Sequence, residues 1–223
     1  KSKDTKKIKI PKNILGGKGA NLAEMGRLRF PVPSGFTIST EACDLFYKNK
    51  KKLNSNVLKQ IKNEIKSIEK EIGKKFGDLK NPLLVSVRSG ARVSMPGMMD
   101  TILNLGLNDK TVEAIAKKTL NTRFAKDCYR RFIQMYSNVV MNVESYNFEE
   151  LIENYKLTKG VLLDTELDAS DWDGLIKDFK NLVKEKTKRE FPQDVNEQLI
   201  GAISGVFLSW ESNRAKVYRK LNQ

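Results

Sequence analysis

The sequence predicts an α+β fold that carries an α-helical insert. Over the first hundred residues, stretches of helical periodicity alternate with short β-branched runs. After residue 108 helical periodicity takes over, and it continues close to the end of the 223-residue chain. We therefore expect an α+β subdomain over residues 1–107, completed by residues 194–223, and a helical subdomain over residues 108–193.

The first elements should be a helix, a strand and a second helix. The segment Ile14–Leu28 opens with two glycines and continues with apolar residues at helical spacing, which predicts a turn followed by a short helix. Phe30–Ile38 is β-rich but interrupted by prolines, as is typical of an edge strand. Ser39 or Thr40 can cap a helix that begins near Glu41.

A long amphipathic helix and two strands should follow. From Val57 to Phe76, apolar residues recur every three or four positions opposite a lysine–glutamate face. The β-branched run Leu83–Val87 predicts a buried strand, and Thr101–Leu107 predicts the next one.

The rest of the chain should be helical. We expect helices over Arg123–Met141, Asp171–Glu185 and Glu197–Leu221, the last two separated by a break at Phe191–Gln193. For the first of these helices, the spacing predicts a buried face of Phe124, Cys128, Phe132, Met135 and Val139.

Composition limits the class of protein. With 39% hydrophobic and 30% charged residues, the chain is typical of a soluble globular protein, and no apolar run approaches the roughly 20 residues that span a bilayer. The start KSKDTKKIKI has no signal-peptide core and no initiator methionine. We therefore expect a piece of a longer protein, located in the cytoplasm or in an intracellular organelle, with no membrane contact.

Two residue types restrict the chemistry. The two cysteines, Cys43 and Cys128, lie far apart in apolar surroundings and form no CxxC pair, which argues against a disulfide framework or a zinc site. Histidine is absent, which excludes Ser–His and Cys–His catalytic pairs and imidazole metal sites. Catalysis would have to use lysine, arginine, carboxylates, backbone amides and a metal ion brought by the substrate.

The net charge of +14 favours an anionic partner, whether nucleotide, nucleic acid or membrane surface. Lysines that decorate solvated helix faces, as in Lys48–Lys52 and Lys184–Glu190, would explain the charge equally well. A nucleic-acid-binding module and a non-catalytic interaction module both remain alternatives, although the basic runs lack the interleaved aromatic residues that single-strand binding favours.

Two motifs can hold phosphate. In GGKGAN, Gly16–Asn21, glycines allow a positive φ, amides at the start of the following helix point outward, and Lys18 adds a positive charge. A plain turn is the alternative, and the spacing of a Walker A motif is absent.

The second motif is VSVRSGARVSMPGMMDT, Val85–Thr101. Arg88 and Arg92 can grip phosphate oxygens through paired hydrogen bonds or can serve in structural salt bridges, and Gly97 lets backbone approach a ligand. The methionines Met95, Met98 and Met99 fit either a core plug or an adaptable cover. Together the two motifs favour a clamp for a nucleoside triphosphate and phosphoryl transfer.

Five segments, in order from about Ile14 to the C-terminus, make the resemblance to a known family specific. They are NILGGKGANLAEM, PVPSGFTISTEAC, NPLLVSVRSGARVSMPGMMDTILNLGLND, RFAKDCYRRFIQMYSNVVM and WESNRAKVYRKLN. The chain resembles the nucleotide-binding domain of the pyruvate, phosphate dikinase family. The sister enzyme, phosphoenolpyruvate synthase, shares the GGK and VRS elements but continues with small and acidic residues, so GARVSMPGMMD favours the dikinase.

The resemblance implies the N-terminal part of an ATP-grasp domain that binds Mg²⁺ with ATP between two halves. In the family, the β-phosphoryl group passes to a histidine on a swivelling domain and then to pyruvate in a barrel domain. Phosphate takes the γ-phosphoryl group, and AMP and pyrophosphate leave. The other half of the ATP-grasp cleft, with the Mg²⁺ ligands, and the other domains would be partners of this segment, in a homodimeric parent enzyme that binds no nucleic acid.

The resemblance also assigns residues. It implies that Lys18 and Arg88 contact the ATP phosphates, and that Gly97 and Met99 close near the γ-phosphate with Asp100 and Thr101 beside them. Arg92 and Lys159 are secondary candidates for a phosphate or docking contact. No catalytic residue or metal ligand is expected within the segment, which we therefore expect to be inactive alone.

Overall fold

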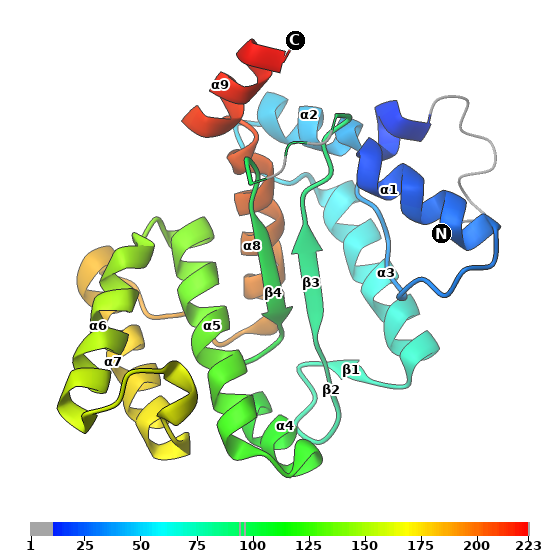
Figure 1. Ribbon diagram of the computed structural model, residues 1–223. Helices are drawn as coiled ribbons and strands as arrows, with labels where there is room; N and C mark the ends of the chain where they lie inside the picture. Colours follow the sequence, from blue (N-terminus) through cyan, green and yellow to red (C-terminus); the bar gives the residue numbers. More distant parts are fainter. Residues whose placement is uncertain (1–10, 94, 96, 223) are drawn as a thin grey trace. The chain divides into compact units, whose positions relative to one another are not determined.

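The structure, a computed structural model, describes residues 11–93, 95 and 97–222 (Figure 1). The segment 1–10, on which the signal-peptide argument rests, and Ser94 and Pro96 of the second motif lie outside the described residues. Helices dominate, and the described strands form two two-stranded sheets. The predicted mixture of helices and short strands is confirmed at this level.

The chain divides into two compact units, each made of separate segments. Unit 1 contains Lys1–Gly73, Arg88–Asp100 and Val206–Gln223, and unit 2 contains Lys74–Val87 and Thr101–Gly205. These compact units do not test the predicted subdomains. The α+β subdomain over residues 1–107 and 194–223 and the helical subdomain over residues 108–193 stay predictions.

Unit 1 contains helices α1 (Pro11–Arg27), α2 (Thr40–Lys48), α3 (Ser55–Ile72) and α9 (Asn213–Asn222). The caps follow the sequence closely. Ser39 is the N-cap of α2, and its hydroxyl accepts a hydrogen bond from the Ala42 amide, as predicted. Asn54 caps α3 in the same way, and Gly73 ends it in the left-handed conformation.

Two sequence predictions fail next to these helices. Phe30–Ile38 forms no strand, because Pro31 and Pro33 lack amide donors for a ladder. The amphipathic helix ends at Gly73 instead of continuing to Phe76, which lies in strand β1 (Lys75–Phe76) of unit 2.

In unit 2, β1 pairs in parallel with β2 (Pro82–Leu83). Strands β3 (Val85–Arg88) and β4 (Thr101–Leu105) form the second sheet, with their arrows in opposite directions in Figure 1. The prediction of one buried strand over Leu83–Val87 is therefore wrong: the run is split between two sheets, and β3 alternates between half-buried and exposed residues. The strand predicted from Thr101 is confirmed as β4.

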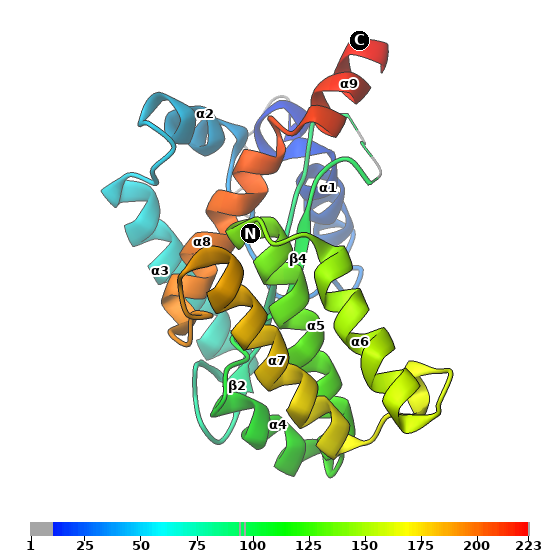
Figure 2. The same cartoon turned by 90° about the vertical axis from the view of Figure 1, so that its left-hand side faces the viewer.

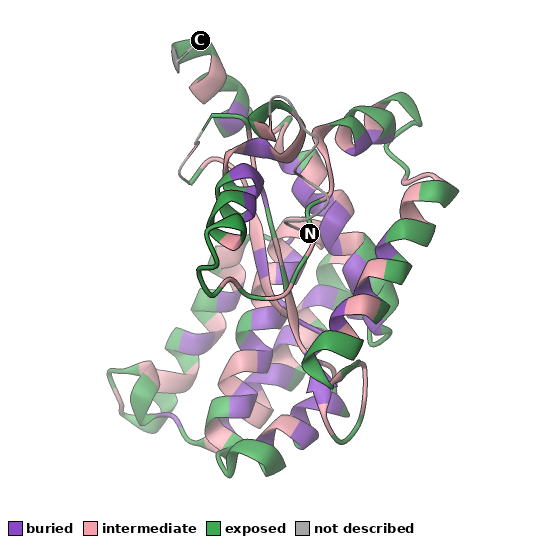
Figure 3. Cartoon of the chain, turned by 90° about the vertical axis from the view of Figure 1, so that its right-hand side faces the viewer, coloured by how far each residue is buried: buried purple, intermediate pink, exposed green. Residues whose placement is uncertain are grey.

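The helices of unit 2 are α4 (Thr111–Thr119), α5 (Thr122–Met141), α6 (Ser145–Lys159) and α7 (Ala169–Thr187), with a short 3₁₀ turn, η2 (Asp164–Glu166), before α7. Figure 2 shows α5, α6 and α7 side by side. Their shared core is aromatic: Phe148 stacks edge-on against Phe179, and Phe191 meets Tyr129, Phe132 and Tyr136. Figure 3 shows buried and exposed residues alternating along the helices, as amphipathic helices require.

The face predicted for α5 is confirmed in part: Phe132 is fully buried, and Met135 and Val139 pack partly buried against the core. Phe124 is 48% exposed and Cys128 only half-buried. Besides Phe132, the buried apolar residues are Ala125, Tyr129, Ile133 and Tyr136, which the prediction did not include. Because α4, α6, α7 and β4 all contact α5, its buried arc is wider than the single stripe that the spacing favoured.

The single helix predicted over Glu197–Leu221 is also wrong. Helix α8 (Val195–Ser209) ends before Trp210, and α9 begins at Asn213. Two serines explain the break, because Ser209 donates its hydroxyl back to the Val206 carbonyl and Ser212 accepts from the Ala215 amide as a cap would. In the described part of the chain, no helix is long and apolar enough to cross a membrane.

Candidate functional site

The glycine motif Gly16–Asn21 and the central part of the second motif, Arg88–Asp100, lie in unit 1, where their backbones touch. We call Arg88–Asp100 the arginine–methionine loop. Gly16 has φ 69° and ψ 170°, which kinks α1 and confirms the predicted glycine turn. The Gly17 amide donates to the Ala91 carbonyl at 2.8 Å, and a Cβ on Gly16 would lie 1.8 Å from the Gly90 carbonyl oxygen. Two glycine-containing segments are thus pressed together in a way that side chains would prevent.

This contact also corrects one expectation. The amides that follow the glycine turn were expected to point outward to a ligand, but the Gly17 amide is already used by Ala91. The positive charge of Lys18, rather than the Gly17 amide, is therefore what this turn offers an anion.

The two segments that form this contact carry three cationic residues. Lys18, Arg88 and Arg92 are exposed, and none forms an ion pair with another of the described residues. The Cβ of Lys18 lies 3.8 Å from the position that a Cβ on Gly90 would take. Gly90 stands between Arg88 and Arg92 in the sequence. Exposed cations without carboxylate partners among the described residues are suited to contact an anion.

The second half of the loop is a turn that exposes Gly97. Gly97 adopts φ 72°, a Cβ there would meet nothing within 4 Å, and the Met98 amide donates to the Met95 carbonyl at 3.1 Å. The methionine side chains, including Met99, are half-buried. The alternatives of core plug and adaptable cover therefore both stay open.

The end of the loop is fastened. The Asp100 amide donates to the hydroxyl of Ser209 at 3.3 Å, and the Asp100 carboxylate pairs with Arg214. Thr101, the next residue, is the first of β4 and belongs to unit 2.

Lys159 has a structural partner. It is the last residue of α6, and its Nζ lies 2.7 Å from a carboxylate oxygen of Asp171, which is 6% exposed. The hydrogen bond from Lys159 lowers the pKa of Asp171, and Asp171 in turn accepts from the Asp168 amide in the capping box of α7. This contact within unit 2 accounts for Lys159 without a ligand.

Neither cysteine chemistry nor a resident metal is suggested by the described residues. Burial, with smaller contributions from Asp44 and Glu211, raises the pKa of the Cys43 thiol to about 11, so the thiolate is scarce at neutral pH. Both cysteines are free. In the described ranges, no three His, Cys, Asp or Glu side chains are grouped to hold a metal ion.

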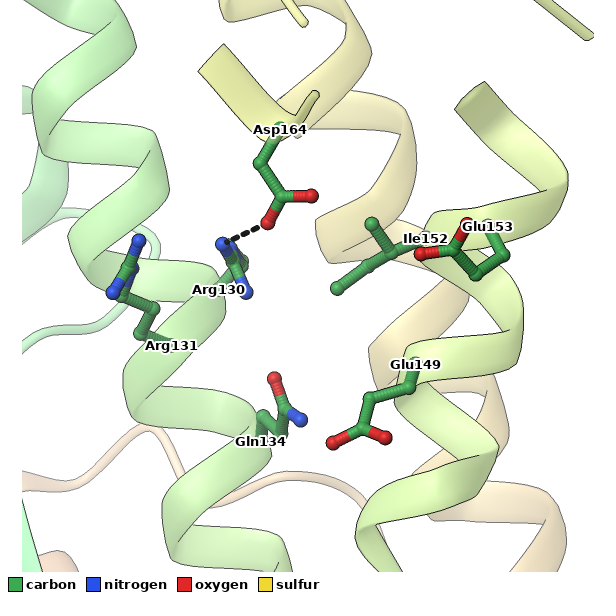
Figure 4. Close-up of a pocket in the computed structure, with 7 residues that line it drawn as sticks. All are labelled: Arg130, Arg131, Gln134, Glu149, Ile152, Glu153 and Asp164. Atoms are coloured by element: carbon green, nitrogen blue, oxygen red, sulfur yellow. Dashed lines mark hydrogen bonds and ion pairs between the residues drawn. The ribbon is translucent and has the colours of Figure 1, made fainter. Parts of the chain in front are cut away.

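Unit 2 holds a separate hollow of about 270 Å³ between α5, α6 and η2 (Figure 4). Its walls mix charges: Arg130 and Arg131 come from α5, Glu149 and Glu153 from α6, and Asp164 from η2. Because the charges nearly balance and Arg130 is already paired with Asp164, this hollow lacks the excess of positive charge that a polyphosphate requires.

Comparison with known proteins identifies the family. The family model described as "Pyruvate phosphate dikinase, AMP/ATP-binding domain" matches residues 12–60 and 50–223. The chain belongs to this family. A pyruvate, phosphate dikinase of Clostridium symbiosum is 56% identical over 212 residues, which are 95% of this chain and 24% of that protein. That of Entamoeba histolytica is 51% identical over 94% of the chain, and a chloroplastic one of Mesembryanthemum crystallinum is 51% identical over 95%.

The dikinase resemblance predicted from the motifs is thus confirmed, and the chain spans about a quarter of the length of these curated relatives (24%, 24% and 22%). Within this AMP/ATP-binding domain, sequence reasoning missed Arg214 and Ser209, which fasten the loop. Both lie in or next to the segment WESNRAKVYRKLN that carried part of the resemblance, but no periodicity or charge pattern links them to Asp100, more than a hundred residues earlier.

Proposed function

We propose that this chain binds the phosphates of Mg²⁺-bound ATP as the nucleotide-binding part of a pyruvate, phosphate dikinase. The observation that carries the proposal is that Lys18, Arg88 and Arg92, which form no ion pair with other described residues, lie in the two segments whose backbones touch at the glycine turn. Lysine supplies a mobile charge, and arginine supplies a paired hydrogen bond to phosphate oxygens.

In this proposal Lys18 and Arg88 hold the phosphates, and Arg92 is a secondary contact. Gly97 and Met99 cover the γ-phosphate end, and Asp100 and Thr101 set the position of that cover. The fold would be the N-terminal part of an ATP-grasp domain, with residues 108–193 as its helical subdomain. Magnesium would arrive with the nucleotide, and its protein ligands would come from the rest of the enzyme.

For the whole enzyme we propose the interconversion of ATP, phosphate and pyruvate with AMP, pyrophosphate and phosphoenolpyruvate. The relatives are named for this activity. Positioning and charge neutralisation are the main needs of phosphoryl transfer, and exposed lysine and arginine side chains meet them without a nucleophile from this segment.

The first test is a calorimetric titration of Mg·ATP into the 223-residue chain. We expect saturable binding, and we expect Arg88→Ala to weaken it by roughly 10- to 100-fold, because hydrogen bonds between charged groups contribute about 1.5–3 kcal/mol. Lys62→Ala, which removes an exposed charge from α3, is the matched control and should leave the affinity unchanged. Unchanged affinity in Arg88→Ala, or no binding by the folded wild-type chain, would refute the proposed role of the loop.

The same chain should not form AMP from ATP, phosphate and pyruvate. It contains no histidine, and the proposed reaction passes through a phosphohistidine. The measurement is chromatographic detection of AMP and pyrophosphate after incubation with Mg²⁺. Sustained AMP formation that depends on pyruvate would show that the acceptor is not a histidine of another domain.

A further inference from the structure

The carboxyl end of the arginine–methionine loop is held by one guanidinium and one hydroxyl. The Nε of Arg214 donates to the Met98 carbonyl at 3.3 Å, and its Nη2 pairs with the Asp100 carboxylate. Ser209, 5% exposed at the end of α8, accepts from the Asp100 amide at 3.3 Å and donates to the Val206 carbonyl at 2.7 Å. All of these residues belong to unit 1.

This arrangement differs from an ordinary surface ion pair. The Arg214 side chain is 50% exposed, and a single exposed pair of that kind contributes little to stability. Here, however, the same guanidinium binds two points of the loop, a main-chain carbonyl and a side chain two residues later. Two contacts from one planar group fix the direction of a segment as well as its distance, which lysine cannot do.

The charge of Asp100 gives the contact a second consequence. The carboxylate lies in the loop that carries Arg88 and Arg92, and a free negative charge there would repel phosphate oxygens. Paired with Arg214, it is neutralised and turned to the α9 side of the loop. Within the described residues, no other cation pairs with it.

We propose that Arg214 is a positioning residue for nucleotide binding, which fixes the carboxyl end of the arginine–methionine loop through Met98 and Asp100. The proposal rests on the proposed function for its effect on ATP. Its effect on the loop does not depend on a nucleotide. Under this proposal Arg214 does not contact the phosphates itself. It acts through the arginine–methionine loop, which contacts them.

The test combines hydrogen exchange with nucleotide titration in the 223-residue chain. In Arg214→Ala, without nucleotide, we expect the amides of Asp100 and Met98 to exchange roughly tenfold faster, because their protection depends on local opening of the loop. We expect the Kd for Mg·ATP to rise roughly fivefold, with a change in thermal midpoint no larger than that of Lys216→Ala. Lys216 is the matched control, since it is an exposed cation on the same helix that pairs with Glu211.

Arg214→Lys separates charge from geometry. It keeps the positive charge beside Asp100 but lacks the fork that reaches Met98, so we expect the Asp100 amide to be partly protected and the affinity for Mg·ATP to stay below that of the wild type.

Each outcome bears on a different claim. Unchanged exchange at Asp100 and Met98 in Arg214→Ala would overturn the fixing of the loop. Faster exchange with unchanged affinity for Mg·ATP would overturn the positioning role and leave a structural contact. If the wild-type chain does not bind Mg·ATP while exchange responds as expected, the proposed function fails and the fixing of the loop stands.

Discussion

Replacing Gly16 by alanine is expected to lower the free energy of unfolding by roughly 3–5 kcal/mol, more than most single substitutions. Two penalties combine. The backbone at φ 69° and ψ 170° lies in a region that only glycine occupies readily, and the new Cβ would lie 1.8 Å from the Gly90 carbonyl oxygen. Because the clash is with backbone rather than with a movable side chain, α1 and the arginine–methionine loop would have to separate.

Gly35→Ala is the matched control for this prediction. A Cβ at Gly35 would meet nothing within 4 Å, and its φ is not in the left-handed region, so alanine should be neutral or stabilising by up to about 1 kcal/mol. Urea unfolding followed by circular dichroism measures both variants. If Gly16→Ala and Gly35→Ala unfold at the same urea concentration, the glycine contact does not hold unit 1 together.

The second large effect is expected at Arg130, where Arg130→Met should cost about 3 kcal/mol. The side chain is only 6% exposed, and its Nη2 lies 3.1 Å from a carboxylate oxygen of Asp164 (Figure 4). Its Nε lies 2.8 Å from a carboxylate oxygen of Asp127, and its guanidinium carbon lies 4.5 Å from the centre of the buried Trp172 ring. Methionine fills similar space, so the loss reports the charge and its hydrogen bonds rather than a cavity.

The neighbouring arginine provides the control. Arg131 pairs with the same Asp127 at 3.0 Å, but its side chain is 59% exposed. Arg131→Met should therefore cost less than about 1 kcal/mol. Thermal unfolding of the two variants side by side tests the difference, and equal losses would mean that burial of Arg130 has no energetic consequence.

The elements that the sequence predicts well are those determined by local chemistry. The spacing of Ile61, Ile65 and Ile68 and the caps Asn54 and Gly73 define α3 without help from distant residues, although its predicted extension to Phe76 overlooked the stop signal of Gly73. Local chemistry also limited the cap of α2 to Ser39 or Thr40, and Ser39 is the N-cap.

The failures occur where distant contacts decide the structure. The β-rich run Phe30–Ile38 has no partner strand among the described residues, and β-propensity without pairing does not make a strand. In unit 2, Gln198 is fully buried and bonds the Gly106 amide and the carbonyls of Leu107 and Pro192, a role that no local pattern of a helical glutamine suggests.

The candidate site shows both what the sequence can predict and what it cannot. Each phosphate motif could be found from its glycines and cations, and together they favoured one nucleotide clamp, but only the family resemblance assigned individual residues to the phosphates. Their contact, the Gly17 amide on the Ala91 carbonyl, depends on backbone atoms and leaves no trace in residue type beyond the glycines. The Arg214–Asp100 pair joins residues 114 positions apart, and many other arginines could have paired with Asp100 as plausibly.

The interleaving of the two units has a consequence for synthesis on the ribosome. Unit 1 needs residues on both sides of unit 2 in the chain, since its last segment begins only at Val206. At roughly 5–20 residues per second, α1, α2 and α3 emerge on the order of ten seconds before the residues of α9. During that interval the arginine–methionine loop lacks Ser209 and Arg214, and Phe46 of α2 lacks Phe207, whose ring centre lies 5.4 Å from its own in the folded unit. The nascent chain therefore exposes, for that time, surfaces that chaperones recognise.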